Sequence, residues 1–356
     1  MRGKIINVIL IILAFFLGII GTITVYKFIP NESVIVNKNE SSVTITEDNT
    51  IKTSIDKVYD AVFLIEATTR SGKSTGSGFA YKVDDKYGYI ITNTHVIDGA
   101  TSVSITNSKG EKFEAKVLGS DTYADIAVLS TTANNVSKIA EIGDSSKIEL
   151  GDTIFTVGSP LGSEYFGTVT KGIIAGKNRL VGSSSIMLEA IQIDAPINEG
   201  NSGGPLLNIN GEVIGVNSMK IASDKIEGMG FAIPINTVMS YVDRLEKGEA
   251  IDRPVFGVTI SDVSNTWQLY RYGIIIDQSV EYGAVLVTVE DNYPAAAAGL
   301  QKGDVIIEMD GTKIEDTSYF RYALYKYQVG ETVTVKYYRD NHIYETKVTL
   351  SKKAEA

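Results

Sequence analysis

Residues 200–205 of this 356-residue chain read Gly-Asn-Ser-Gly-Gly-Pro, with the serine at position 202. Glycines on both sides of a serine permit a tight turn in which backbone N–H groups converge on one point. We expect an oxyanion hole at Gly200, Asn201 and Ser202, with the amides of Gly200 and Ser202 as donors. The Ser202 hydroxyl beside it would attack a carbonyl carbon. The stretch therefore predicts nucleophilic catalysis by a serine.

A serine is a weak nucleophile without a base, and the chain holds only two histidines. His95 directly follows the β-rich run 89–92, so the end of a strand would present it. His342 stands beside a predicted hairpin turn and is expected on the solvated surface. His95 is therefore the candidate base for Ser202.

An imidazole base needs an acid that fixes its tautomer. Asp125 opens the apolar run 126–129 and is the candidate for this role, with Asp121 as the alternative. His95, Asp125 and Ser202 follow one another in the chain order of the chymotrypsin arrangement. Because these residues are far apart in the sequence, the fold must assemble the site.

Short β runs between glycines fill the chain from about residue 53 to residue 234. Asn210-Gly211 separates two of these runs, which is a strong signal for a hairpin. The helix that follows would be capped by Asn236 and ended by Gly248. Regular short strands with few helices favour an all-β barrel or sandwich. The clearest runs are 89–92, 125–129, 153–157, 205–207 and 213–216.

The last hundred residues have a different pattern, typical of a small β domain with two helices. Pro294 suits the first turn of a short helix, and Gly299 suits the position after its end. The second helix is expected to stop before Gly330. The predicted helices are 294–298 and 318–328, and the predicted strands are 284–289, 304–309, 332–339 and 343–350.

The composition excludes several classes of function. The 43 acidic and 33 basic side chains give a net charge of −10, which argues against a nucleic-acid partner. The chain has no cysteine, so disulfides, thiol catalysis and cysteine-ligated metals are excluded. Two histidines nearly exclude a multi-histidine metal site as well. We expect neither a metal nor a cofactor.

The N-terminal segment is apolar: residues 5–26 carry no charge, and Arg2 and Lys4 precede them. At 1.5 Å per residue the run would span about 33 Å, close to the thickness of a bilayer core. The positive-inside rule then places the N-terminus in the cytoplasm and the rest of the chain outside. The alternative is a cleaved signal peptide, whose apolar region is usually shorter.

Several motifs together resemble the HtrA (Deg/Do) family of serine proteases. They are Thr94-His95-Val96, Asp125-Ile126-Ala127-Val128, the serine turn at 200–205 and Gly230-Phe231-Ala232-Ile233-Pro234. The last hundred residues resemble the PDZ domain that follows the protease in that family, through the stretches 294–300 and 302–306. The resemblance covers roughly residues 53–350.

The resemblance implies a mainly β chain: a trypsin-like double β-barrel followed by a small α+β PDZ domain. It also implies ATP-independent cleavage of misfolded or signalling proteins, and usually a homotrimer. One PDZ domain and an N-terminal apolar segment place the chain near the membrane-anchored members. The expected division is 1–30 for the cytoplasmic tip and transmembrane anchor, 31–52 for a polar stalk, 53–248 for the protease domain, 249–352 for the PDZ domain and 353–356 for a tail.

In trypsin-like folds the floor of the S1 pocket lies six residues before the nucleophile, which is Pro196 here, and Ile197 is the next wall position. These residues imply an apolar pocket and cleavage after small or medium aliphatic residues. Asn201 replaces the aspartate that pairs with a newly cut N-terminus in digestive relatives. We therefore expect activation by loop ordering. The candidate loops are 159–167, 178–189 and 218–228.

The stretch Val255-Phe256-Gly257-Val258 resembles the PDZ loop whose backbone N–H groups bind the C-terminal carboxylate of a peptide. The adjacent strand would pair with that peptide by β-augmentation. A PDZ domain that serves only as a spacer is the alternative.

The leading hypothesis for function is a membrane-anchored serine endopeptidase that acts outside the cytoplasm on unfolded or membrane proteins. One alternative is a proteolytically silent chaperone or PDZ scaffold. The other is an esterase or another acyl-transfer enzyme that uses the same three residues.

Overall fold

The computed structural model of the chain describes residues 3, 6, 12–22, 47–159, 162–183, 186–218 and 228–352. The chain divides into two compact units, residues 1–45 and 46–356. In the first unit, residues 12–22 form a helix. Within the described residues, no helix is long and apolar enough to cross a membrane. The remainder of the predicted span 5–26, most of the predicted stalk and the tail lie outside these residues.

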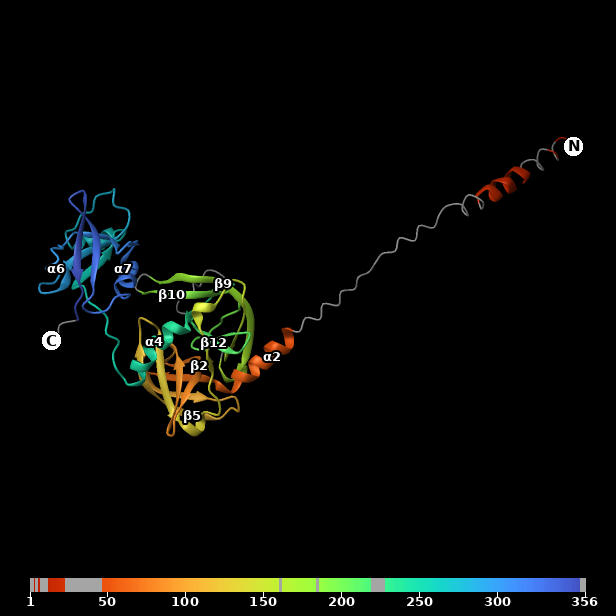
Figure 1. The fold of residues 1–356 in the computed structure, drawn as a ribbon, viewed down its shortest axis with the longest axis horizontal. Helices are drawn as coiled ribbons and strands as arrows, with labels where there is room; N and C mark the ends of the chain where they lie inside the picture. Colours follow the sequence, from red (N-terminus) through yellow and green to blue (C-terminus); the bar gives the residue numbers. More distant parts are fainter. Residues whose placement is uncertain are drawn as a thin grey trace. The chain divides into compact units, whose positions relative to one another are not determined.

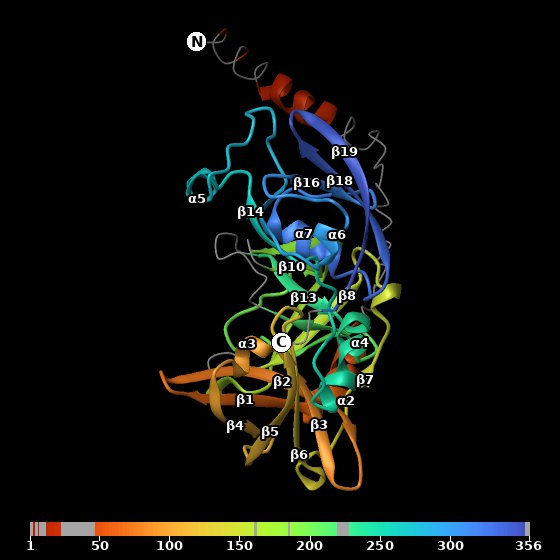
Figure 2. The same ribbon diagram turned by 90° about the vertical axis from the view of Figure 1, so that its left-hand side faces the viewer.

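Six antiparallel strands form a closed barrel in the order β1-β2-β3-β6-β5-β4 (Figure 2). Its interior is filled by large side chains such as Phe63, Ile90 and Leu129, which are fully buried. The short helix α3 (Thr94–Ile97) follows β3 directly. The strands are β1 (Val62–Thr69), β2 (Lys73–Val83), β3 (Tyr87–Thr92), β4 (Ala100–Thr106), β5 (Lys112–Asp121) and β6 (Ile126–Thr132).

A second barrel follows in the chain. Its sheet runs β11-β8-β9-β10-β13-β12-β7, and β11 also pairs with β12, so six of these strands close on themselves. The turn at Asn210-Gly211 joins β11 to β12, which confirms the predicted hairpin. The mainly β, double-barrel architecture expected from the sequence is thus confirmed. The strands are β7 (Glu141–Ile142), β8 (Thr153–Gly158), β9 (Thr168–Ser183), β10 (Ile186–Ile193), β11 (Pro205–Asn208), β12 (Glu212–Asn217) and β13 (Gly230–Pro234).

Helix α2 (Glu47–Val58) begins inside the segment that was expected to be a stalk. Its apolar residues Ile51, Ile55 and Val58 recur every three or four positions and so share one face. Val58 is fully buried, and the Ser54 hydroxyl donates to the Ile209 carbonyl at 2.5 Å. The helix therefore packs on the second barrel instead of extending away from it.

Helix α4 (Ile235–Glu246) closes the double barrel, with Val238, Val242 and Leu245 buried on one face. The prediction that Asn236 caps it is wrong. The helix begins one residue earlier, and the Asn236 side chain instead accepts a hydrogen bond from the Ser145 amide at 3.1 Å. Gly248 follows the helix at φ +73°, as a glycine in the predicted terminating position should.

The C-terminal domain is the sheet β14-β15-β16-β18-β19 with three helices (Figure 1, blue). Helix α7 (Thr317–Leu324) is capped by Asp316 and ends four residues before the predicted Gln328. Helix α5 (Thr266–Arg271) was not predicted. The remaining elements are β14 (Val258–Asp262), β15 (Ala284–Val289), α6 (Pro294–Ala297), β16 (Val305–Met309), β17 (Thr312–Lys313), β18 (Thr332–Arg339) and β19 (His342–Thr349).

Arg253, in the segment that joins α4 to the C-terminal domain, packs against both domains. Its guanidinium donates to both carboxylate oxygens of Asp121, at 2.5 and 2.7 Å. The same group stacks over the rings of Tyr123 and Tyr325, at 5.0 and 5.2 Å from their centroids. Because Tyr325 directly follows α7, this arginine connects the protease-side loop to the C-terminal domain.

Candidate active site

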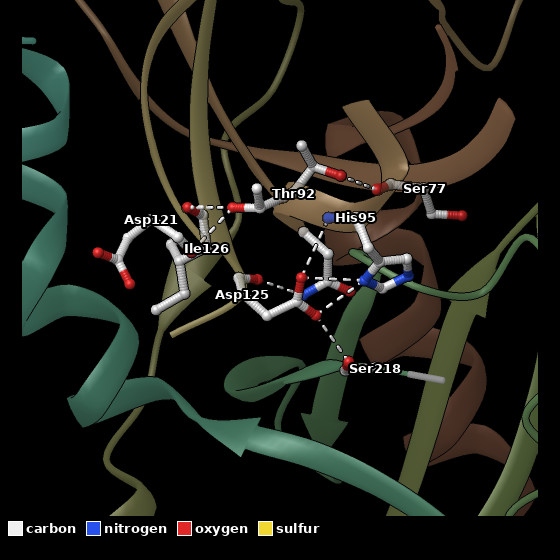
Figure 3. A network of polar contacts seen from close by, with 9 residues as sticks. Ser77, Thr92, His95, Asp121, Asp125, Ile126 and Ser218 are labelled. Atoms are coloured by element: carbon white, nitrogen blue, oxygen red, sulfur yellow. Dashed lines mark hydrogen bonds and ion pairs between the residues drawn. The ribbon is translucent and has the colours of Figure 1, made fainter. Parts of the chain in front are cut away.

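Asp125 and His95 form the centre of the candidate site (Figure 3). The Asp125 carboxylate is fully buried, and its two oxygens lie 3.0 and 2.8 Å from Nδ1 of His95. The backbone amide of His95 also donates to this carboxylate, at 3.1 Å. These contacts fix the imidazole in one orientation and hold Nδ1 as the donor, so that Nε2 is left as the basic nitrogen.

The loop that carries Asp125 is held from several sides. Asp125 lies between β5 and β6 at φ +57°, a left-handed conformation that non-glycine residues seldom adopt. The Asn93 side chain donates to the Asp125 carbonyl at 2.8 Å, and the Thr94 hydroxyl donates to the carbonyls of Asp121 and Ile126. The turn before α3 thus positions the acid as well as the histidine.

Asp121 does not contact His95, because its carboxylate is paired with Arg253 in a bidentate ion pair. Its Oδ1 also accepts a hydrogen bond from the Ala124 amide at 2.6 Å. In Figure 3 its carboxylate points away from the imidazole. Of the two aspartates proposed from the sequence, the structure therefore brings Asp125 to the histidine.

Ser218 is a member of the site that the sequence analysis did not identify. Its hydroxyl donates to Asp125 Oδ2 at 2.9 Å, and its amide donates to the Phe231 carbonyl at 3.0 Å. The second barrel thus contributes a contact to the acid that the first barrel carries. The only sequence signal is its place directly after the buried strand β12. Residues 219–227 of the predicted activating loop 218–228 lie outside the described residues.

Ser202 lies in a compact turn between the two barrels and is 4% exposed. The Asn201 amide donates to the Asn198 carbonyl at 3.0 Å, so its hydrogen closes the turn. A Cβ atom at Gly203, where φ is +83°, would lie 2.2 Å from the carbonyl oxygen of Ser77. Gly200 is buried at φ +98°. The turn therefore requires glycine at 203, as its position next to the serine suggested.

The two residues predicted to line the S1 pocket precede this turn. Pro196 is exposed, and its carbonyl accepts a hydrogen bond from the Thr170 hydroxyl at 3.0 Å. Ile197 is half-buried and packs on an apolar cluster of the second barrel. A Cβ atom at Gly230 would lie 2.8 Å from the Ile197 side chain. Ile197 thus presents an apolar side chain over the start of β13.

The predicted PDZ loop, Val255 to Val258, opens a groove of about 390 Å³ between β14 and α7. Gly257 adopts φ +78°, and Phe256 is buried edge-to-face against Phe320, with ring centroids 5.1 Å apart. Ile260 and Leu324 line the groove with apolar surface. The loop and the strand expected to bind a peptide therefore border one groove.

His342 is the first residue of β19, directly after the turn, and is exposed as expected; its Nδ1 lies 2.7 Å from the Asp340 carbonyl. Among the described residues, no group of three histidine or acidic side chains is placed to hold a metal ion.

Comparison with known proteins identifies two domains. Residues 76–216 match the model of the trypsin-like peptidase domain, and residues 254–350 match that of the PDZ domain. The serine protease Do-like HtrB of Bacillus subtilis is 40% identical over 288 residues, which are 79% of this chain and 63% of that protein. The serine protease Do-like HtrA of Lactobacillus helveticus is 41% identical over 307 residues, 83% of this chain and 74% of that protein.

Solved structures give the same assignment. The serine endoprotease from Yersinia pestis aligns with a TM-score of 0.63 at 27% identity, over 85% of this chain and 98% of that one. The HtrA-type protease AlgW with a tripeptide aligns with a TM-score of 0.63 at 27% identity, over 86% and 98%.

Proposed function

The chain belongs to the HtrA family of serine proteases, and on that premise we propose that it is an endopeptidase that degrades or processes unfolded or signalling proteins. His95, Asp125 and Ser202 would carry out the reaction through an acyl-enzyme, without ATP and without a cofactor. Membrane anchoring and regulation by the PDZ domain complete the proposal.

Each proton in the reaction passes through His95. It takes the proton of the Ser202 hydroxyl as Oγ attacks the carbonyl carbon of the scissile bond. The oxyanion of the tetrahedral intermediate is stabilised by the amides of Gly200 and Ser202. When the C–N bond breaks, His95 gives the proton to the leaving amine. Water, deprotonated by His95, then hydrolyses the ester and restores Ser202, while Asp125 stabilises the imidazolium at both transfers.

The observation that supports this proposal best is the placement of Asp125. A fully buried carboxylate lies within 3.0 Å of His95 Nδ1 and is bound by the hydroxyl of Ser218 as well. Burying a charged group is costly unless it is paired and hydrogen-bonded. A polar network of this kind suits a histidine that gains and loses a proton during turnover, and a scaffold has no need of it.

The specificity proposal rests on Ile197 and Pro196. An apolar side chain at the pocket favours a small or medium aliphatic residue at P1, because a charged side chain would lose its hydration there without a partner. Cleavage after Val, Ala, Ile or Leu is the expected preference.

The PDZ groove is proposed to bind the C-terminus of a peptide. Its apolar lining, with Ile260 and Leu324, suits a hydrophobic last residue, and β14 offers an edge for β-augmentation. Peptide binding there would regulate the protease domain through the loops around its active site.

The apolar run 5–26 supports anchoring by a single membrane-spanning helix. With Arg2 and Lys4 on the cytoplasmic side, the protease and PDZ domains would lie outside the cytoplasm. A homotrimer is proposed on family membership alone. The substrates would then be extracytoplasmic unfolded or membrane proteins.

The test compares the full chain, purified in mild detergent, with its Ser202→Ala variant on unfolded casein. Cut sites are mapped by mass spectrometry. Cleavage after aliphatic residues that vanishes in the variant supports the protease, the nucleophile and the apolar pocket together. If neither form cuts, hydrophobic C-terminal peptides are added to both. If no cleavage is seen even with these peptides, the alternative is favoured, a proteolytically silent chaperone or PDZ scaffold.

A further inference from the structure

Ser77 lies in β2 of the first barrel, but its side chain bonds to the second. The side chain is fully buried. Its hydroxyl donates to the Gly200 carbonyl at 2.6 Å and accepts a hydrogen bond from the Ser159 amide at 3.0 Å. Ser159 directly follows β8, at the start of the predicted activating loop 159–167. One hydroxyl therefore joins the nucleophile turn to the start of that loop.

The backbone of Ser77 adds contacts to the same turn. Its amide donates to the Ser202 carbonyl at 2.8 Å, so the residue binds the carbonyls on both sides of Asn201. Its own carbonyl accepts a hydrogen bond from the Thr92 hydroxyl at 2.7 Å (Figure 3). Thr92 ends the strand that precedes His95. Ser77 thus lies between the segment that carries the base and the turn that carries the nucleophile.

The contact to Gly200 controls a single peptide plane. The Gly200 carbonyl and the Asn201 N–H belong to one planar unit. The oxygen end is held by Ser77, and the N–H end donates to Asn198. Glycine at φ +98° has wide rotational freedom, so it does not hold this plane by itself. The amides of Gly200 and Ser202 belong to the two neighbouring peptide units, so the orientation of this plane constrains where they point.

The surroundings leave the Ser77 side chain little freedom. A Cβ atom at Gly158 would lie 3.1 Å from Ser77 Oγ and 2.5 Å from the side-chain oxygen of Asn201. A Cβ atom at Gly204 would lie 3.1 Å from the Ser77 Cβ. Backbone atoms therefore pack closely around the hydroxyl, which favours one rotamer and a fixed direction for its hydrogen bonds.

We propose that Ser77 is a positioning residue for the oxyanion hole. Its hydroxyl holds the peptide plane between Gly200 and Asn201 so that the flanking amides converge, and it couples that plane to Ser159. The inference rests on the proposed function, because it assigns the hole to a hydrolytic reaction. Through this one buried side chain, ordering of the backbone at the start of loop 159–167 would also order the turn that carries Ser202.

The test is the Ser77→Ala variant of the full chain, assayed on an internally quenched peptide with valine at P1. Because the hole stabilises the transition state more than the bound substrate, kcat should fall about 10- to 100-fold with KM within about twofold. Hydrogen exchange by mass spectrometry should show faster exchange in peptides that cover residues 198–204. Unchanged kcat together with unchanged exchange there overturns the proposal.

The matched control is Ser54→Ala. Ser54 is also buried, and its hydroxyl also donates to a backbone carbonyl of the second barrel, that of Ile209. It should lower the unfolding midpoint, leave kcat unchanged and leave exchange in 198–204 unchanged. An equal loss of kcat in both variants would show that Ser77 contributes only to general packing, and it would overturn the proposal. If the wild-type chain cleaves nothing, the exchange measurement still decides whether Ser77 holds the turn. Failure of the proposed function can therefore be told apart from failure of this proposal.

Discussion

The hydroxyl of Ser218 donates to Oδ2 of Asp125, the oxygen that also lies 2.8 Å from the imidazole of His95. Two hydrogen bonds to one carboxylate oxygen, from different barrels, fix the acid in position. Ser218→Ala removes one of them without adding bulk. A hydrogen bond to a charged group is worth about 1.5–3 kcal/mol, so kcat/KM should fall about 10- to 100-fold.

This prediction is checked with the same quenched peptide and with the unfolding midpoint measured in parallel. The control is Ser240→Ala, which removes an exposed hydroxyl of α4 that bonds only within its own helix. Activity in Ser218→Ala equal to that of the control would show that the second hydrogen bond has no catalytic consequence.

The ion pair between Asp121 and Arg253 is largely shielded from solvent, with side-chain exposures of 10% and 17%. Burial opposes the charge on Arg253, but its hydrogen bonds to the Asp121 carboxylate and the attraction between the two charges outweigh this, and the net effect raises the pKa of the guanidinium. Arg253→Met leaves the Asp121 carboxylate without its partner, at a cost of about 3 kcal/mol. Unfolding by guanidinium chloride should show this loss of stability as a lower midpoint concentration.

For this pair, Arg271→Met is the matched control, because Arg271 stacks on the exposed ring of Trp267 and should contribute less than about 1 kcal/mol. The double variant Asp121→Asn with Arg253→Met should recover part of the lost stability, since no uncompensated charge is left. Equal midpoints for Arg253→Met and the control would contradict the prediction.

Tyr81, in β2, donates to Glu246 at the end of α4. Burial first, and then this hydrogen bond, raise the pKa of its hydroxyl well above the ordinary value of 10. Below pH 10 the phenol is neutral in both the folded and unfolded chain. Above pH 10 only the unfolded chain ionises, so the folded state loses stability as the pH rises.

The unfolding free energy of the wild-type chain, measured at pH 8, 10 and 11, should therefore fall above pH 10, and Tyr81→Phe should reduce the slope. At pH 8 the variant should be about 1 kcal/mol less stable, because Glu246 loses a donor. Tyr270→Phe, at a ring that is 79% exposed, is the control and should change neither value. A slope that Tyr81→Phe leaves intact contradicts the assignment.

Ile197→Ala should widen the proposed S1 pocket. Loss of the side chain removes apolar contact for a valine at P1 and makes room for leucine or phenylalanine, so the ratio of kcat/KM between Phe and Val peptides should rise about tenfold. A peptide library read by mass spectrometry measures this ratio. Ile139→Ala, at a 49% exposed isoleucine before β7, should leave the ratio unchanged.

Gly257→Ala should weaken the proposed binding of peptides by the PDZ groove. Gly257 has φ +78°, and its added Cβ would lie 2.0 Å from Cβ of Tyr293, so the loop 255–258 must shift. The Kd for a labelled peptide with a hydrophobic C-terminus should rise at least about tenfold. Gly273→Ala is the matched control, since its φ is +68° but nothing lies within 4 Å of the added atom.

The sequence allowed the double barrel and the candidate triad to be predicted, because both depend on local signals. Short apolar runs bounded by glycine mark strands. The glycine-flanked Ser202, together with a histidine that closely follows a strand, indicates catalysis by a serine nucleophile. The sequence favoured Asp125 over Asp121 by its place at the start of an apolar strand, but it did not reveal the pairing of Asp121 with Arg253, which is distant in the chain.

Other features could not be predicted, for physical reasons that differ. Ser218 bonds to a residue 93 positions away, and a serine after a strand carries no distinctive pattern. Helix α5 has only one buried residue, Leu269, so it shows no apolar periodicity. Helix α2 is polar overall, and only the spacing of Ile51, Ile55 and Val58 could have separated it from a stalk.

The placement of the candidate triad on two barrels has a practical meaning for engineering. His95 and Asp125 belong to the first set of six strands and Ser202 to the second, and residues 133–140 connect the sets. A chain divided there would yield two inactive fragments that still share complementary apolar surfaces, such as those of Val128 and Phe155. Fused to two interacting proteins, the halves would form a split reporter, in which hydrolysis reports that the two proteins have bound each other.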